Sequence, residues 1–232
     1  MKVKFGAVVV GGRGKLSGHV ASQNRAGAYF RTKVTPVNPK TTAQTNVRNR
    51  LAGISSGWRS LTAAQRAAWN SVVTDFAKTD IFGDLRNPSG FNLYQRLNNN
   101  LVTCGESQIT SPPAVLAVDA FTSISLAAED STVAESFSLT FAPAVAADHL
   151  VKVYAAPPLS AGINFVKSEY RLIAILPNSD TSPADLLSEY QAVFGSTGEA
   201  GQKIFVQCIQ VEETSGIAGT SISASAIVTV SS

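Results

Sequence analysis

The residues best suited to chemistry are a glycine-rich run, Gly11-Gly12-Arg13-Gly14-Lys15, and two histidines, His19 and His149. A phosphate-binding Walker loop needs G-x-x-x-x-G-K followed by Ser or Thr, within a parallel-sheet context. Here Leu16 follows the lysine, so the run is interpreted as a turn. The histidines have no Cys, Asp or Glu cluster near them in the sequence, and no serine stands in a nucleophile-elbow motif. The sequence therefore predicts no enzyme, no catalytic residue, no metal site and no cofactor.

The charge of the chain is unevenly distributed. Residues 1–100 contain fifteen Lys or Arg and three acids, a formal charge of +12, and the first acid is Asp75. Residues 101–232 contain four basic residues and thirteen acids, a formal charge of −9. Such asymmetry indicates a basic segment that meets a negative partner. That partner is nucleic acid, a neighbouring protein, or the acidic half of another copy of the chain.

The first forty residues are predicted to form an extended basic arm (residues 1–40). Glycines punctuate it, Pro36 and Pro39 exclude a helix at its end, and short runs such as 19–22 and 28–34 read as extended segments. The predicted partner-binding residues of the arm are Arg13, Lys15, Arg25, Arg31, Lys33 and Lys40. Arginine favours bidentate contact with carboxylates or phosphates. We favour assembly with protein over nucleic acid, because no sequence-reading DNA or RNA motif is found.

Residues 41–105 carry three helix patterns. Thr41 or Thr42 can cap the first helix, Thr62 and Gln65 have capping-box spacing for the second, and Ser89 precedes the third, which Gly105 closes. Apolar residues recur at helical spacing in each. The residues expected to hold these helices together by packing are Trp58, Trp69, Leu51 and Tyr94.

The rest of the chain is predicted to be a linker followed by strands. Residues 106–118 contain Pro112-Pro113, which is typical of a stiff spacer. Residues 119–232 show short alternating apolar runs separated by turn signals, which predict an immunoglobulin- or fibronectin-III-like β-sandwich. The stretch 183–194 reads instead as a short helix. The fold class expected for the whole chain is therefore α+β.

The cysteine positions, the lengths of the apolar runs and the charged fraction restrict the cysteine chemistry and the environment of the chain. Cys104 and Cys208 lie far apart without a CxxC motif, so both are expected to be free thiols. No apolar run is long enough to span a bilayer, and the opening segment lacks a signal-peptide cleavage site, so we expect a chain made in a cytoplasm. Charged residues make up 15 % of the chain against about 25 % in typical domains, which favours a protein that buries surface against partners.

Four segments of the sequence carry a family pattern. They are G-R-G-K-L-S-G at 12–18, N-R-A-G-A-Y-F-R-T-K-V-T-P-V-N-P-K-T at 24–41, Q-T-N-V-R-N-R-L at 44–51, and W-R-S-L-T-A-A-Q-R-A-A-W at 58–69. Together they resemble a group of small uncharacterised proteins encoded in bacteriophages and prophages. The resemblance covers residues 10–100, and the β half is similar only to immunoglobulin-like domains that decorate phage particles in general.

The resemblance implies a non-enzymatic virion structural protein. It would be a minor or decorating capsid-associated protein, located in the virion and made in the host cytoplasm, with other virion proteins or copies of itself as partners. Two alternatives stay open. One is a packaging protein that binds nucleic acid through residues 1–100, and the other is a tail- or surface-associated adhesion module.

Overall fold

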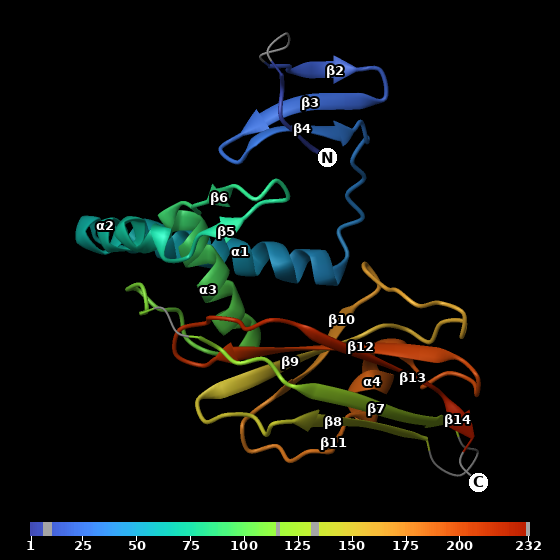
Figure 1. Ribbon diagram of the computed structural model, residues 1–232. Coiled ribbons are helices and arrows are strands. Elements are labelled where there is room, and N and C mark those ends of the chain that lie inside the picture. Colours follow the sequence, from blue (N-terminus) through green and yellow to red (C-terminus); the bar gives the residue numbers. More distant parts are fainter. Residues whose placement is uncertain (7–10, 115–116, 131–134, 231–232) are drawn as a thin grey trace.

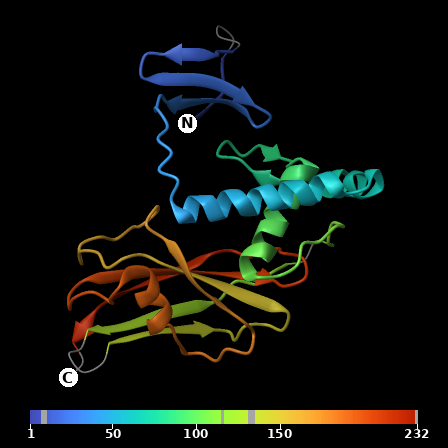
Figure 2. The same cartoon turned by 180° about the vertical axis from the view of Figure 1, so that it is seen from behind.

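The computed structural model describes residues 1–6, 11–114, 117–130 and 135–230. Within these ranges the chain contains four α-helices and mainly antiparallel sheets, so the predicted α+β class is confirmed. A small N-terminal sheet is followed by a group of helices and then by a body made of two sheets (Figure 1). Seen from the front and from behind, the helices lie between the N-terminal sheet and the body (Figure 2).

The N-terminal sheet has four antiparallel strands in the order β1-β4-β3-β2. They are β1 (Lys2–Val3), β2 (Gly14–Leu16), β3 (His19–Asn24) and β4 (Gly27–Thr32). The β3–β4 turn is fixed by Asn24, whose Oδ1 accepts a hydrogen bond from Ala26 N at 2.9 Å, and by Gly27, whose φ of 107° favours glycine. Among the described residues of this sheet only Ala21 is buried. The extended segments of the arm thus pair with one another but enclose almost no core.

The helical group follows after an exposed connection over residues 33–41. Its elements are α1 (Thr42–Ser60), α2 (Ala63–Ser71), the 3-10 turn η1 (Val72–Thr74), the hairpin strands β5 (Lys78–Thr79) and β6 (Leu85–Arg86), and α3 (Gly90–Cys104). The helices pack pairwise, α1 and α2 each lying against α3. The antiparallel β5–β6 hairpin follows η1 and precedes α3 in the sequence, and it lies on the side of the helical group that faces the N-terminal sheet (Figure 1).

The predicted helix ends are confirmed. Thr41 caps α1, and its side chain accepts a hydrogen bond from Gln44 N. Thr62 and Gln65 form the expected capping box at the start of α2. Ser89 caps α3, and Gly105, with a φ of 89°, ends it in a left-handed conformation. These caps satisfy terminal backbone groups locally, which is why short sequence motifs identify them.

The helical core centres on Tyr94, which is buried. The rings of Trp58 and Trp69 lie 5.4 and 5.3 Å from its ring centroid, so three of the four expected packing residues meet at one point. Leu51 does not join them, because 47 % of its surface is exposed. In α1 the buried position is Ile54. The expectation for Leu51 was wrong because α3 covers α1 only from about Ile54 onward and leaves its first half uncovered.

The body has two four-stranded sheets. One follows the order β10-β9-β12-β13, with β9 (His149–Ala155), β10 (Arg171–Leu176), β12 (Lys203–Glu212) and β13 (Ile222–Ile227). The other follows the order β11-β8-β7-β14, with β7 (Ser123–Asp130), β8 (Ser136–Ala142), β11 (Ala184–Asp185) and β14 (Thr229–Val230). All pairs are antiparallel except β14 with β7.

One core joins the two sheets. It includes Phe137 and Leu139 of β8, and Val151 and Val153 of β9, all of which are fully buried. The helix α4 (Leu187–Phe194) lies within the stretch read as helical from the sequence, and its Tyr190 stacks on Phe137 at 4.4 Å between ring centroids. The body therefore has the buried interior that the N-terminal sheet lacks.

The helix α3 also contacts the body. Asn100 donates from Nδ2 to the carbonyl oxygen of Gly216 at 2.8 Å and accepts from the ammonium of Lys152 at 2.8 Å. Lys152 is only 4 % exposed, and burial lowers the pKa of its side chain. Gly216 has a φ of 70° and packs against the backbone of Leu97, where a Cβ would overlap the Leu97 carbonyl oxygen. The junction between helices and body is thus built from close polar contacts.

Candidate basic interface

The structure places all six predicted partner-binding residues on the N-terminal sheet, its turns or the connection to α1. Each one is exposed, and none lies within 4.0 Å of a carboxylate among the described residues. Lys15 lies in β2, Arg31 lies in β4, and both pair with Val20 of the intervening β3. Paired residues of antiparallel strands point to the same face, so Lys15 and Arg31 share one face of the sheet.

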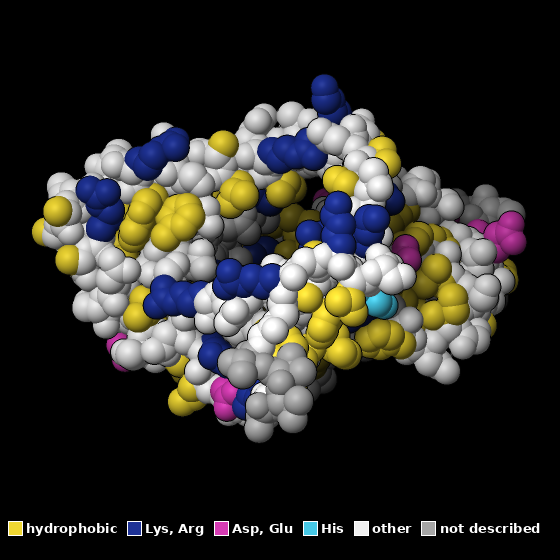
Figure 3. Space-filling view, turned by 90° about the horizontal axis from the view of Figure 1, so that it is seen from above, with side chains coloured by type: hydrophobic (Ala, Val, Ile, Leu, Met, Phe, Trp, Pro, Cys, Tyr) yellow, Lys and Arg dark blue, Asp and Glu magenta, His cyan; other side chains and the backbone are white. Residues whose placement is uncertain are grey.

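The other four residues occupy turns and the connection. Arg13 donates a hydrogen bond to Gln23 Oε1 at 3.3 Å, and Arg25 lies in the β3–β4 turn. Lys33 and Lys40 follow β4, and the φ of Lys40 is 51°. The view from above shows Lys and Arg side chains spread widely over this face with few acids among them (Figure 3). The six residues therefore form a dispersed basic surface.

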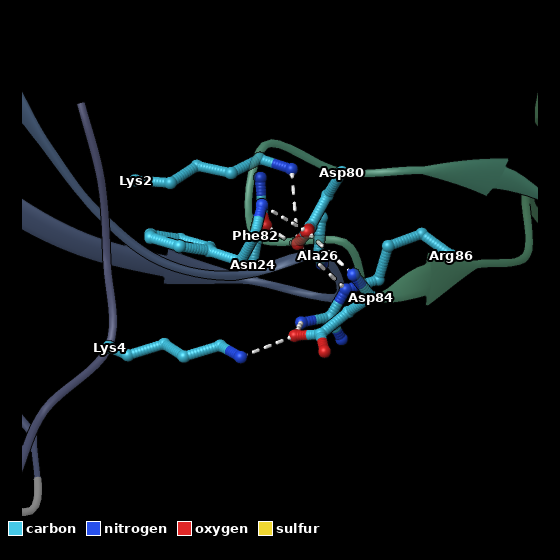
Figure 4. A network of polar contacts seen from close by, with 8 residues as sticks. All are labelled: Lys2, Lys4, Asn24, Ala26, Asp80, Phe82, Asp84 and Arg86. Carbon is cyan, nitrogen blue, oxygen red and sulfur yellow. Dashed lines mark hydrogen bonds and ion pairs between the residues drawn. The ribbon is translucent and has the colours of Figure 1, made fainter.

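A cluster of ion pairs joins the N-terminal sheet to the β5–β6 hairpin (Figure 4). Lys2 Nζ lies 3.7 Å from Asp80 Oδ2, and Lys4 Nζ lies 2.7 Å from Asp84 Oδ2. Arg86 bridges both acids, at 3.4 Å from Asp80 and 3.6 Å from Asp84. The Lys4–Asp84 pair is exposed on both sides, and exposed pairs contribute about 0–1 kcal/mol and are screened by salt. The sheet is thus held on the hairpin by charge, and its attachment should weaken as salt rises.

Asp80 organises this cluster. Its side chain is 2 % exposed, and Oδ1 accepts hydrogen bonds from Phe82 N at 2.8 Å and Asp84 N at 3.1 Å. Burial raises the pKa of Asp80, but these hydrogen bonds, the Arg86 contact and the charge of Lys2 together hold it below its ordinary value. Asp80 therefore shapes the hairpin turn and anchors the sheet at once.

Sequence analysis missed this cluster of Lys2, Lys4, Asp80, Asp84 and Arg86, which is called the docking cluster below. Lys2 and Lys4 precede the residues selected in the arm, and no residue between the second and third helix patterns was selected. A usable signal was present, because these are two of the three acids in the first hundred residues and they lie close together in a strongly basic segment. Such isolated acids are natural partners for the surrounding cations.

The histidines, cysteines and acids of the described residues are not gathered into a metal site. No group of three or more His, Cys, Asp or Glu that could hold a metal occurs among them. His19 and His149 lie in β3 and β9, in different sheets. Cys104 ends α3, whereas Cys208 is buried in β12, where burial raises the pKa of its thiol to about 12. Such a thiol is chemically inert at neutral pH.

Comparisons with known proteins supply no template for this surface. No family model matches the chain, and neither a curated protein nor a solved structure matches it. Among the described residues, no helix combines the length and apolar character needed to cross a membrane. The function is therefore inferred from charge, burial and packing.

Proposed function

We propose that this protein is a non-enzymatic bacteriophage virion structural protein, a minor or decorating component that is anchored to the capsid through the basic surface of residues 1–40. The observation that carries the proposal is the separation of charge between the two ends of the chain. The +12 half presents exposed cations on a small sheet, whereas the −9 half contains the two-sheet body. The phage resemblance of residues 10–100 points in the same direction.

The small sheet supports an anchoring role because it is poorly suited to stand alone. Isolated sheets need a hydrophobic face or a packed helix for independent stability. This one buries only Ala21 among its described residues and attaches to the hairpin through ion pairs. A partner surface that covers the sheet would supply the missing burial and would neutralise its cations.

We further propose that the body is an immunoglobulin- or fibronectin-III-like sandwich. Its support is the order of the strands. The pair β7–β8 lies in one sheet and the pair β9–β10 in the other, after which β11 returns beside β8 and β12 returns beside β9. This alternation is typical of Greek-key sandwiches. Such a body would project from the particle while the basic surface holds it.

The test is incorporation into particles. A tagged chain is expressed in the cells that encode it, particles are purified on a density gradient, and the chain is quantified by mass spectrometry against the most abundant particle protein. The neutralised variant carries R13Q, K15Q, R25Q, R31Q, K33Q and K40Q. It leaves the docking cluster intact. The matched control exchanges Arg and Lys at the same six positions and keeps every charge.

The neutralised variant is expected to lose most of its incorporation. Each exposed charge contact contributes up to about 1 kcal/mol, so loss of six should lower occupancy by about tenfold or more. The charge-conserving control should stay close to the original level. Equal incorporation of both variants would show that the basic surface is not the anchor. Absence of the original chain from purified particles would show that it is not a virion protein.

A further inference from the structure

A cavity of about 250 Å³ lies where the N-terminal sheet meets the helices. Three elements that are distant in sequence enclose it. Arg25 comes from the β3–β4 turn, Lys78 and Arg86 come from the two strands of the hairpin, and Ser89 and Arg96 come from the start and the middle of α3. The cavity therefore exists only when the sheet is docked on the hairpin.

The lining of this cavity is strongly cationic. It contains Arg25, Lys78, Arg86 and Arg96 and no acid. Only Arg86 pairs with carboxylates, on the side of the hairpin where the docking cluster lies. Among the described residues, the other three have no carboxylate within 4.0 Å. Because two acids already pair with Arg86, it is the other three positive side chains around this space that repel one another unless an anion lies between them.

Two further features favour an anion at this position. The N-terminus of α3, a helix of 15 residues with no acid in its first turn, opens onto the cavity at Ser89 and Asn92. The Asn92 N–H donates to the Ser89 hydroxyl, and the helix dipole at such an end favours negative charge. Arg96 is held in place by Phe76, whose ring centroid lies 5.6 Å from the guanidinium carbon. This contact orients the Arg96 side chain beside the cavity.

We propose that this cavity binds a phosphate group. A single carboxylate would leave most of the charge of the three cations without an acid partner unmatched, whereas phosphate offers up to two negative charges and several acceptor oxygens that suit the arginine fork. The volume corresponds to roughly eight water molecules at about 30 Å³ each, enough for a phosphate and an attached group. The source of the phosphate is either a free phosphate compound or the backbone of a nucleic acid.

The test uses the full-length protein and two double variants. Arg25→Gln/Lys78→Gln removes two cations of the cavity that are exposed and make no ion pair among the described residues. Arg31→Gln/Lys33→Gln is the matched control, because it also removes one Arg and one Lys, both exposed and outside the cavity. Thermal unfolding checks that each variant is folded. Binding of inorganic phosphate is then measured by calorimetry at constant ionic strength.

The cavity variant is expected to weaken phosphate binding by about tenfold to a hundredfold, since each charge-assisted hydrogen bond is strong. The control is expected to bind as the original chain does. Absence of saturable phosphate binding by the original chain would overturn the proposal, and so would equal weakening by the two double variants. Either result is independent of whether the chain is a virion protein.

A short labelled DNA duplex then identifies the source of the phosphate. If the cavity takes backbone phosphates, the cavity variant weakens DNA binding more than the control does, and inorganic phosphate competes with DNA at matched ionic strength. This outcome supports the proposal and assigns it to nucleic acid. If inorganic phosphate binds at the cavity but does not compete with DNA, the proposal holds and the ligand is a free phosphate compound.

Discussion

Three consecutive asparagines on α3 allow a sharp test of how the helices are held together. Asn98 is fully buried, accepts a hydrogen bond from Ile109 N at 2.7 Å, and donates to the carbonyl oxygens of Ile109 at 3.3 Å and Tyr94 at 3.0 Å. Asn98 therefore ties the segment that follows α3, at Ile109, to the helix. We predict that Asn98→Ala destabilises the helical group strongly, whereas Asn99→Ala, whose side chain makes no hydrogen bond in the described structure, does not.

The magnitude follows from the groups left without partners. The N–H and the carbonyl of Ile109 each lose a hydrogen bond, and each loss costs about 1–1.5 kcal/mol at a half-buried site. Replacing Asn by Ala inside a helix returns about 0.5 kcal/mol of helix propensity. The free energy of unfolding should therefore fall by about 2 kcal/mol in Asn98→Ala. In Asn99→Ala it should stay unchanged or rise by about 0.5 kcal/mol.

Tryptophan fluorescence is the assay of choice, because the chain has two tryptophans and both lie in the helical group. Trp69 also reports directly on the segment concerned, since its Nε1 donates to the carbonyl oxygen of Thr110 at 2.9 Å. With a urea m-value of about 2 kcal/mol/M, the Asn98→Ala midpoint should fall by about 1 M. Equal midpoints for the Asn98 and Asn99 variants would refute the assignment of this role to Asn98.

Three other changes have defined outcomes. Gly216→Ala should lower the free energy of unfolding by about 2–4 kcal/mol, measured by thermal circular dichroism, whereas Gly105→Ala, also at positive φ but facing open space, should cost only about 1 kcal/mol. Burial raises the pKa of Glu212, but hydrogen bonds donated by Ser215 and Thr214 hold it below the ordinary 4.5. Its carboxylate therefore stabilises the fold above pH 4.5, and this stabilisation is lost as the pH falls through the lowered pKa. In Glu212→Gln, the urea midpoint should therefore decrease less between neutral and acidic pH than it does in the original chain. Ile54→Ala should cost about 2–4 kcal/mol, and Leu51→Ala less than about 1 kcal/mol in the same urea assay.

The attachment of the N-terminal sheet to the hairpin also determines whether the proposed phosphate cavity forms. The N-terminal sheet is held on the hairpin by Lys2 and Lys4 against two acids, with little apolar burial. The cavity proposed for phosphate requires that same contact, because Arg25 comes from the sheet and Lys78 from the hairpin. A bound phosphate would therefore bridge the two parts and strengthen their attachment.

The limits of sequence reasoning are clear at particular residues. Thr62 with Gln65, and Ser89 with Gly105, were identified correctly because a cap is satisfied within four or five residues of itself. Leu51 was assigned wrongly because the apolar period of α1 continues past the part that α3 covers. Periodicity shows which side of a helix is apolar, but it does not show how far a partner helix extends.

By itself, the sequence determined the local elements and the separation of charge. The helix caps, the alternating strands of the second half and the +12 and −9 halves depend on neighbouring residues or on simple totals. Only the tertiary structure decided that the strands of residues 1–32 pair into a sheet, that Asp80 and Asp84 receive Lys2 and Lys4, and that four cations surround one cavity. The ion pairs and the cavity join residues some fifty or more positions apart, and contacts over such distances depend on the closure of long loops and on packing that no local pattern encodes.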